Sequence, residues 1–235
     1  MKEKVRRYDL LVWDWDGTIM DSTPTIVHCI QQAFRDLDFP VPEDSIASYV
    51  IGLGVHDSLR RVVPSIQPAR FPELVDRFRF HYLAKDHELN LFVGMRELLE
   101  DLKSKGFLLG VATGKPRRGL NRSLDFHDLK HLFHDTRTAD ESFSKPHPGM
   151  LLDLSDNLQV PLRKMLMIGD TTHDLEMAQS AGVDGIAVTY GAHPAEALRS
   201  AKSLACLDNV EQLASWLQTN LYEQEFAFNK ISKLS

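Results

Sequence analysis

Two aspartates separated by one residue, Asp14 and Asp16, stand at the end of a short apolar run. In an extended chain, residues two apart point to the same side, so both carboxylates would project into one space. Carboxylates that close repel each other, and a metal ion or a shared proton must relieve the repulsion. Gly17 follows and permits a tight turn whose backbone N–H groups can face an anion. The alternative is an acidic surface turn, because Asp-Gly is a common turn dipeptide.

Four further polar residues follow other apolar runs or precede a helical pattern. Thr113 stands where a second apolar run stops, Lys145 precedes a helical pattern, and Asp170 and Asp174 follow a third run. Each alone has an ordinary explanation, such as a helix N-cap for Asp or Thr. Together they would place carboxylate, hydroxyl and ammonium groups at one edge of a sheet. That combination suits divalent-metal-assisted chemistry on a phosphate.

The elements that would position these groups alternate between strand and helix. Apolar runs without hydrophobic/polar alternation are typical of a parallel sheet covered on both faces. The runs are residues 8–13, 107–112, 165–168 and 185–189, with weaker candidates at 132–135 and 204–207. Apolar positions at helical spacing lie between them, in 95–102, 150–158 and 210–217. We therefore predict an α/β fold, a doubly wound parallel sheet with a Rossmann-like core.

One connection is too long for this pattern. Residues 17–107 separate the first two predicted strands, whereas a crossover helix needs about 10 to 15 residues. Residues 22–91 must then be an insertion, and its two apolar helical faces open near Pro24, with Thr23 as the N-cap, and near Pro72. We predict a catalytic core of residues 1–21 and 92–235, with residues 22–91 as a small helical cap over the carboxyl ends of the strands.

Length, charge and cysteine content exclude several classes of protein. The 235 residues fit one large domain or two small ones, and 27 basic against 33 acidic residues give a net charge of −6. That sign argues against binding nucleic acid by bulk electrostatics. The apolar run at residues 10–13 is too short for a signal peptide or a membrane span, and Cys29 and Cys206 are not spaced as a disulfide or zinc motif. A reduced, cytoplasmic compartment and no membrane partner are expected, and no oligomeric state is indicated.

The four motifs, in this order, resemble those of the haloacid dehalogenase-like hydrolases, and among them the phosphoglycolate phosphatase-like members. They are DxDGT at residues 14–18, the motifs around Thr113 and Lys145, and GDxxxD at residues 169–174. The helical insertion resembles the small α-helical cap of that family. Ile19 and Met20 depart mildly from the Leu and Val that often follow the first motif.

The resemblance implies a role for each aspartate of these motifs. Asp14 would be the nucleophile and form an aspartyl-phosphate. Asp16 would protonate the leaving oxygen and then deprotonate the attacking water. Asp14, Asp170 and the backbone carbonyl of Asp16 would hold Mg²⁺. The dehalogenases that attack carbon lack the second aspartate of the first motif, so its presence here favours phosphoryl transfer.

The remaining motif residues would serve the phosphate. Thr113 and Lys145 would bind the phosphoryl oxygens, and Lys145 would also reduce the repulsion between nucleophile and substrate. Asp174 would orient Lys145 or a metal-bound water.

The cap is expected to choose the substrate. Residues 52–56 resemble the cap specificity loop of the family, and His56, Arg60 and Arg61 are the candidates for substrate contact, since an arginine pairs well with a carboxylate or a second phosphate. The alternative is a flexible loop beside a solvated basic face.

Two further groups are interpreted as structural. His127, His131 and His134 have the spacing of a metal site, but surface histidines are the favoured interpretation, because no carboxylate or cysteine motif accompanies them. Trp15 is expected to pack under the cap.

The sequence therefore predicts a Mg²⁺-dependent phosphatase of a small phosphorylated metabolite, with 2-phosphoglycolate as the leading candidate. An inorganic pyrophosphatase, a nucleotidase, a sugar-phosphate phosphatase and a β-phosphoglucomutase stay open as alternatives. A catalytically silent binding or regulatory protein on the same fold is the alternative of another class. Residues 222–235 receive no assignment.

Overall fold

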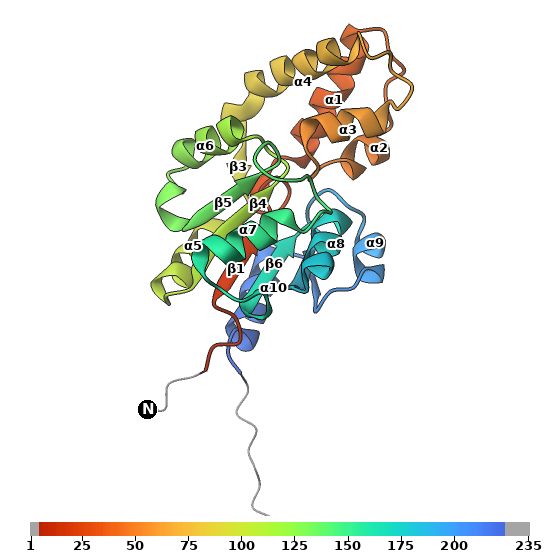
Figure 1. The fold of residues 1–235 in the computed structure, drawn as a ribbon. Coiled ribbons are helices and arrows are strands. Elements are labelled where there is room, and N and C mark those ends of the chain that lie inside the picture. Colours follow the sequence, from red (N-terminus) through yellow and green to blue (C-terminus); the bar gives the residue numbers. More distant parts are fainter. Residues whose placement is uncertain (1–4, 224–235) are drawn as a thin grey trace, which may run out of the picture.

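The computed structural model describes residues 5–223, so most of the unassigned segment 222–235 lies outside the described residues. Within that range a six-stranded sheet forms the centre of the molecule, in the order β5-β4-β1-β6-β7-β8 with every neighbouring pair parallel (Figure 1). The strands are β1 (Leu10–Trp13), β4 (Leu108–Thr113), β5 (Asp135–Thr138), β6 (Met165–Gly169), β7 (Asp184–Val188) and β8 (Cys206–Leu207). The predicted doubly wound α/β fold is confirmed.

Helices cover both faces of this sheet, as the unbroken apolar runs require. In β1 the side chains alternate between two cores: Leu11 and Trp13 belong to one, and Leu10 and Val12 to the other. The first core includes α5 (Met95–Ser104), α6 (Arg117–Phe126) and α10 (Val210–Asn220), and the second includes α7 (Gly149–Leu158) and α8 (Thr172–Ala181). The short α9 (Ala195–Ser200) packs beside β7.

A helical lobe lies over the carboxyl ends of the strands (Figure 1). It comprises α1 (Thr23–Asp36), α2 (Asp44–Tyr49), α3 (Val55–Val62) and α4 (Phe71–Lys85). The chain enters the lobe through β2 (Met20–Asp21) and leaves it through β3 (Asn90–Leu91), and these two segments pair antiparallel. Both crossings between lobe and sheet are therefore tied together by one small ribbon.

Three expectations about local structure need correction. The weak strand predicted at residues 132–135 is a 3₁₀ turn at Lys130–Leu132, and β5 begins only at Asp135. This edge strand is polar and partly exposed, so no apolar run marks it. The last strand is shorter than predicted, only Cys206–Leu207. Thr23 is the first helical residue rather than the N-cap of α1, and Ser22 takes the capping position.

The structure also bears on the cysteines and on possible membrane spans. Cys29 and Cys206 are both free thiols. In residues 5–223 no helix combines the length and the apolar character needed to cross a membrane.

Candidate active site

The sheet topology brings the predicted motif residues to one edge. Asp14 directly follows β1, Thr113 ends β4 and Asp170 follows β6, and these three strands are neighbours in the sheet. Lys145 reaches the same place from the loop before α7, and Asp174 from the first turn of α8. All five are almost completely buried.

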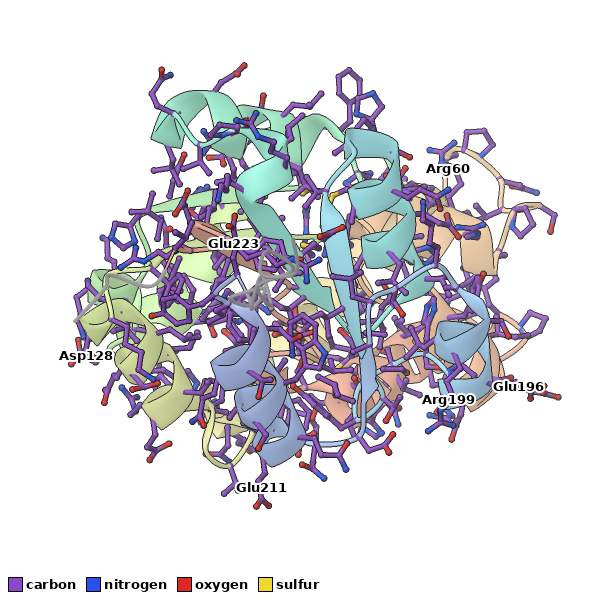
Figure 2. All side chains as sticks on the ribbon, turned by 90° about the horizontal axis from the view of Figure 1, so that it is seen from below. Arg60, Asp128, Glu196, Arg199, Glu211 and Glu223 are labelled. Atoms are coloured by element: carbon purple, nitrogen blue, oxygen red, sulfur yellow. The ribbon has the colours of Figure 1, made fainter. Side chains whose placement is uncertain are left out.

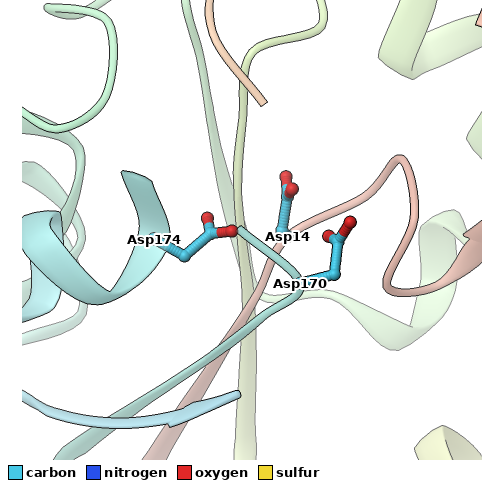
Figure 3. A group of neighbouring side chains, drawn as sticks. All are labelled: Asp14, Asp170 and Asp174. Atoms are coloured by element: carbon cyan, nitrogen blue, oxygen red, sulfur yellow. The ribbon is translucent and has the colours of Figure 1, made fainter. Parts of the chain in front are cut away.

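Three of the carboxylates face one another. Asp14, Asp170 and Asp174 each offer an oxygen within 4.8 Å of the others' (Figure 3). The Nζ atom of Lys145 lies 2.8 Å from Oδ1 of Asp14 and 2.6 Å from Oδ1 of Asp174. Three carboxylates against one ammonium leave a deficit of two positive charges, which a divalent cation would match.

This crowding shifts the affinity of the groups for protons. Burial, reinforced by Asp174 and Asp170 and opposed by Lys145, raises the pKa of Asp14 well above its ordinary value. Burial and the Asp174 charge raise the pKa of Asp170 to about 7. Burial disfavours the ammonium of Lys145, but the carboxylates of Asp14 and Asp174 outweigh it and raise the pKa of Lys145. The three carboxylates therefore have too little positive charge beside them, since Lys145 is the one ammonium among the described residues that contacts the cluster.

Asp170 is clamped in place. One of its oxygens accepts the Thr18 hydroxyl at 2.7 Å, and the other accepts the Ala192 N–H at 2.7 Å. Two glycines make room for the carboxylate: a Cβ atom at Gly17 would lie 2.2 Å from its Oδ2 atom, and one at Gly191 would lie 2.1 Å from the same atom. Any side chain at either glycine would displace Asp170. The glycine of the first motif thus serves packing as well as a turn with φ of +87°.

Asp174 and Asp14 differ in how their oxygens are used. One oxygen of Asp174 accepts a hydrogen bond from Lys145, and the other accepts from the hydroxyl and the N–H of Thr171. The Thr171 contacts form a capping box at the start of α8. Neither oxygen of Asp14 accepts a directed hydrogen bond from the described residues, although both are buried. Asp14 therefore keeps free lone pairs, and the cluster fits an oxygen-seeking divalent cation with Asp14 and Asp170 as ligands.

Asp16 faces a different set of partners. Its carboxylate accepts the Ser22 hydroxyl at 2.9 Å, and both of its oxygens lie 3.2 Å from Nζ of Lys115. Lys115 also donates to the hydroxyl of Tyr82, which comes from α4 in the helical lobe. The two aspartates of the first motif thus each have a separate lysine. Only the backbone carbonyl of Asp16 was expected at the metal, and the clustered carboxylates do not include its side chain.

Lys115 and Tyr82 are site residues that the sequence reasoning missed. Lys115 stands two residues after Thr113 in the same motif, so its position was a usable signal. The helical spacing predicts Tyr82 only as a member of the apolar face that follows Pro72, and nothing there marks its hydroxyl as part of the site. Thr113 itself accepts the N–H of Lys115 at 3.1 Å through its hydroxyl oxygen, and this leaves the hydroxyl hydrogen free to point to a ligand.

A cavity of about 480 Å³ connects these groups to the helical lobe. Asp14, Asp16 and Thr113 lie at its polar end, and the lobe supplies mostly apolar walls. The arginines in its lining are Arg79, Arg118 and Arg122. The cavity is large enough for a ligand and contains the candidate chemistry at one end.

The structure does not bring the predicted cap candidates to this cavity. His56, Arg60 and Arg61 are exposed, and none of them lines it. The Arg60 guanidinium lies over the ring of Phe71, 4.6 Å from its centre, and Figure 2 shows Arg60 at the outer edge of the molecule. Arg61 lies over Tyr49 in the same way, at 5.8 Å. Helix α3 turns its basic side outward.

The other residues interpreted as structural lie away from the carboxylates. Trp15 is fully buried, donates to Ser123 at 3.2 Å and packs edge-on against Phe133. His131 and His134 are exposed, and the three histidines form no candidate metal group among residues 5–223.

The helical lobe is seated directly on the site. A Cβ atom at Gly114, next to Thr113, would lie 2.3 Å from the backbone oxygen of Leu53. The N–H of Gly54 donates to Ser144 at 3.0 Å, one residue before Lys145. Residues 52–54 therefore cover the polar end of the cavity, where the sequence placed a specificity loop.

Two histidines outside the lobe contact the last residue of α2. His173 and His193 both place Nε2 near the backbone oxygen of Tyr49, at 3.0 and 2.9 Å. Nδ1 of His193 accepts the N–H of Thr172, so its Nε2 carries the proton and donates. The ring of Tyr49 stacks on His193 at 4.5 Å. This contact joins the lobe to the loop that follows the carboxylate motif.

Comparison with known proteins shows which family this chain resembles. The model of the family described as haloacid dehalogenase-like hydrolase matches residues 11–188. A phosphoglycolate phosphatase of Aliivibrio fischeri is 30% identical over 88% of this chain and 96% of its own length. A "probable phosphatase IndB" of Dickeya dadantii is 31% identical over 87% of this chain and 91% of its own. The crystal structure of a "predicted phosphatase" from Clostridium acetobutylicum superposes with a TM-score of 0.80 at 25% identity, over 90% of this chain and 99% of that one.

Proposed function

The chain belongs to the haloacid dehalogenase-like hydrolases, and on that premise we propose that it is a Mg²⁺-dependent phosphatase acting on a small phosphorylated metabolite. The observation that carries the proposal is Asp14. It is a buried carboxylate with one oxygen in an ion pair with Lys145 and the other without a partner among the described residues, beside two further carboxylates at the end of a cavity.

Asp14 is the proposed nucleophile. Its free oxygen would attack phosphorus and form an aspartyl-phosphate, while the alcohol leaves. Lys145, fixed between Asp14 and Asp174, would hold a phosphoryl oxygen and lower the repulsion between two anions. The unused hydroxyl hydrogen of Thr113 would donate to another phosphoryl oxygen.

Asp16 is the proposed acid and base. It would give a proton to the leaving alcohol oxygen and then take one from the water that hydrolyses the aspartyl-phosphate. Ser22 and Lys115 hold its carboxylate on the cavity side of the site. This position supports a role toward the leaving group rather than toward the metal.

Asp14 and Asp170 would hold Mg²⁺, with Asp174 as a neighbour that positions Lys145. Bound Mg²⁺ would supply the positive charge that the cluster lacks and offset the charge of the phosphoryl group. Thr18 and the Ala192 N–H keep Asp170 aimed into the cluster.

We also propose that residues 22–91 are a cap domain and that residues 1–21 and 92–235 are the catalytic core. The two paired crossings, β2 and β3, support such a division, because a lobe hinged on one ribbon can open and exclude water when it closes. The expected cytoplasmic location stays a prediction.

The names of the relatives favour phosphoglycolate as the first substrate to test. They do not decide it, because the relative named for phosphoglycolate and the one named IndB are equally similar to this chain. The pyrophosphatase, nucleotidase, sugar-phosphatase and mutase alternatives belong in the same panel.

The test is phosphate release from a panel of phosphate esters and pyrophosphate, with Mg²⁺, with excess chelator, and with Ca²⁺. We expect Mg²⁺ to support turnover, chelator to abolish it, and Ca²⁺ to replace it poorly, because Ca²⁺ prefers more ligands and longer bonds. Full turnover in chelator would refute the metal assignment. A protein that binds esters without releasing phosphate would support the silent binding protein instead.

A further inference from the structure

We propose that the preferred substrate is a phosphate monoester whose alcohol carries an apolar body of ring size, held against the helical lobe. This proposal rests on the proposed phosphatase function and specifies its substrate class. It departs from phosphoglycolate, a two-carbon ester with a carboxylate next to the phosphate.

The walls of the cavity carry the proposal. Between the catalytic end and the mouth the lobe presents side chains from three helices, namely Ile26, Ile30, Val55, Leu59, Phe78 and Leu83. They line a cavity of about 480 Å³, which lies within the range of about 300–1,000 Å³ typical of sites for drug-sized ligands. A two-carbon ester would leave most of this apolar surface unfilled.

The buried cations near the phosphate end are already paired. Lys145 forms ion pairs with Asp14 and Asp174, and Lys115 forms an ion pair with Asp16. A second anionic group close to the phosphate would therefore compete with a carboxylate for either lysine or lie against aliphatic walls. An unpaired charge in such surroundings is costly.

The arginines that line the cavity are also poorly suited to bind a second anionic group near the phosphate. Arg122 pairs with Asp86, and Arg79 lies 3.8 Å from Asp76. Arg118 is exposed, and its side chain forms no ion pair or hydrogen bond with any part of the chain between residues 5 and 223. Its exposure places the free positive charge at the mouth, so the interior selects for an apolar body.

The experiment compares kcat/KM for three esters of primary alcohols, so that the leaving groups are similar: ethyl phosphate, phosphoglycolate and cyclohexylmethyl phosphate. We expect cyclohexylmethyl phosphate to exceed both others by at least about 10-fold, since even one buried methylene is worth about that much discrimination. Mg²⁺ is present throughout.

A variant tests where the discrimination arises. Leu83 is 53% exposed and lines the cavity, whereas Phe80, 62% exposed on the same helix, does not. Leu83→Glu should lower the preference for cyclohexylmethyl over ethyl phosphate about 3- to 10-fold, because the apolar body loses an apolar contact and meets a charge. Phe80→Glu, the matched control, should leave the preference unchanged. If Leu83→Glu does not fold, Phe78→Ala with Phe80→Ala as control makes the same comparison.

The outcomes separate the two proposals. Equal kcat/KM for the three esters, or a preference for phosphoglycolate, overturns the apolar substrate class and leaves the phosphatase function standing. An unchanged preference in Leu83→Glu, or an equal loss in Phe80→Glu, overturns the assigned site of discrimination. If none of the esters in this series or the wider panel is hydrolysed with Mg²⁺, the proposed function itself fails.

Discussion

Asp14 and Asp16 are one residue apart in the chain but lie in unlike surroundings. Asp14 is buried beside two other carboxylates and keeps one oxygen without a partner among the described residues, whereas Asp16 accepts hydrogen bonds from Ser22 and Lys115 beside the cavity. In the proposed mechanism Asp14 attacks phosphorus and Asp16 donates and accepts protons. Their substitution by asparagine should therefore have different consequences.

Asp14→Asn should abolish turnover and form no phosphoenzyme, because an amide oxygen attacks phosphorus far less readily. Asp16→Asn keeps the nucleophile but loses acid–base help worth about 10²- to 10⁴-fold. With a nitrophenyl ester, whose leaving group needs little protonation, the first step should survive better than the second, and phosphoenzyme should accumulate. Rapid quench with labelled substrate and mapping of the labelled residue would measure this.

The control for this comparison is Asp21→Asn, an exposed aspartate in β2 close to the first motif. It should bind label and turn over substrate as the unaltered protein does. Label on a residue other than Asp14, or trapping of label by Asp14→Asn, would contradict the assignment.

Single residues also show how far the sequence alone reaches. The four motif positions could be predicted because each stands at the end of a buried strand or the start of a helix, and the carboxyl ends of parallel strands share one edge. Lys115 stands close enough to Thr113 to be suspected, but its contact with Tyr82 could not be predicted, because that contact joins α4 to the end of β4 across the lobe interface. The position of Arg60 depends on which side of α3 packs inward, and its ring contact with Phe71 turns it away from the cavity.

At the scale of elements, the contact between α2 and the sheet side depends on neutral histidines. Burial lowers the pKa of His193 to about 4, with the nearby His173 acting in the same direction and Asp174 and Glu176 against it. The pKa of His173 is lowered by burial too. Both rings place Nε2 near the Tyr49 oxygen, and this contact raises the pKa, so it is burial that makes the two histidines resist protonation.

The lowered pKa values of these histidines predict that the protein becomes less stable as the pH falls. An unfolded histidine has a pKa of about 6.5, so the unfolded chain binds the proton more tightly than folded His193 does. The stabilisation is complete above about pH 6.5 and is lost as the pH falls towards 4. We expect the free energy of unfolding, measured with urea, to fall between pH 7 and pH 4.5 by on the order of 1–3 kcal/mol from these histidines.

His193→Gln keeps an amide donor for the Tyr49 oxygen and does not titrate. The free energy of unfolding of this variant should therefore decrease less between pH 7 and pH 4.5. His87→Gln, at an exposed position, is the matched control and should keep the original slope. The same slope in both variants would show that His193 does not supply the pH dependence.

At the scale of the whole molecule, access to the site depends on the lobe. Asp14 is 1% exposed and Lys145 2% exposed, and residues 52–54 lie against Gly114 and Ser144 at the polar end of the cavity. Substrate could reach the site by two routes. The lobe could rotate about the β2–β3 ribbon, or substrate could pass the exposed lining residues Arg79 and Leu83 of α4 and Arg118 of α6 while the lobe stays fixed. The buried catalytic end favours rotation of the lobe.

A reversible cross-link distinguishes the two routes. A Cβ atom built at Gly54 lies 3.1 Å from that of Ala139, close to the separation of about 3.5–4.5 Å found in disulfides. In Gly54→Cys/Ala139→Cys, oxidation should fix the lobe on the sheet and suppress turnover, and reduction should restore it. Each single variant is a control, because Cys29 and Cys206 are free and oxidant alone must have no effect. Neither Gly54 nor Ala139 lines the cavity. Full activity of the oxidised protein, with the disulfide verified by mass, would therefore show that substrate enters past α4 and that the lobe need not open.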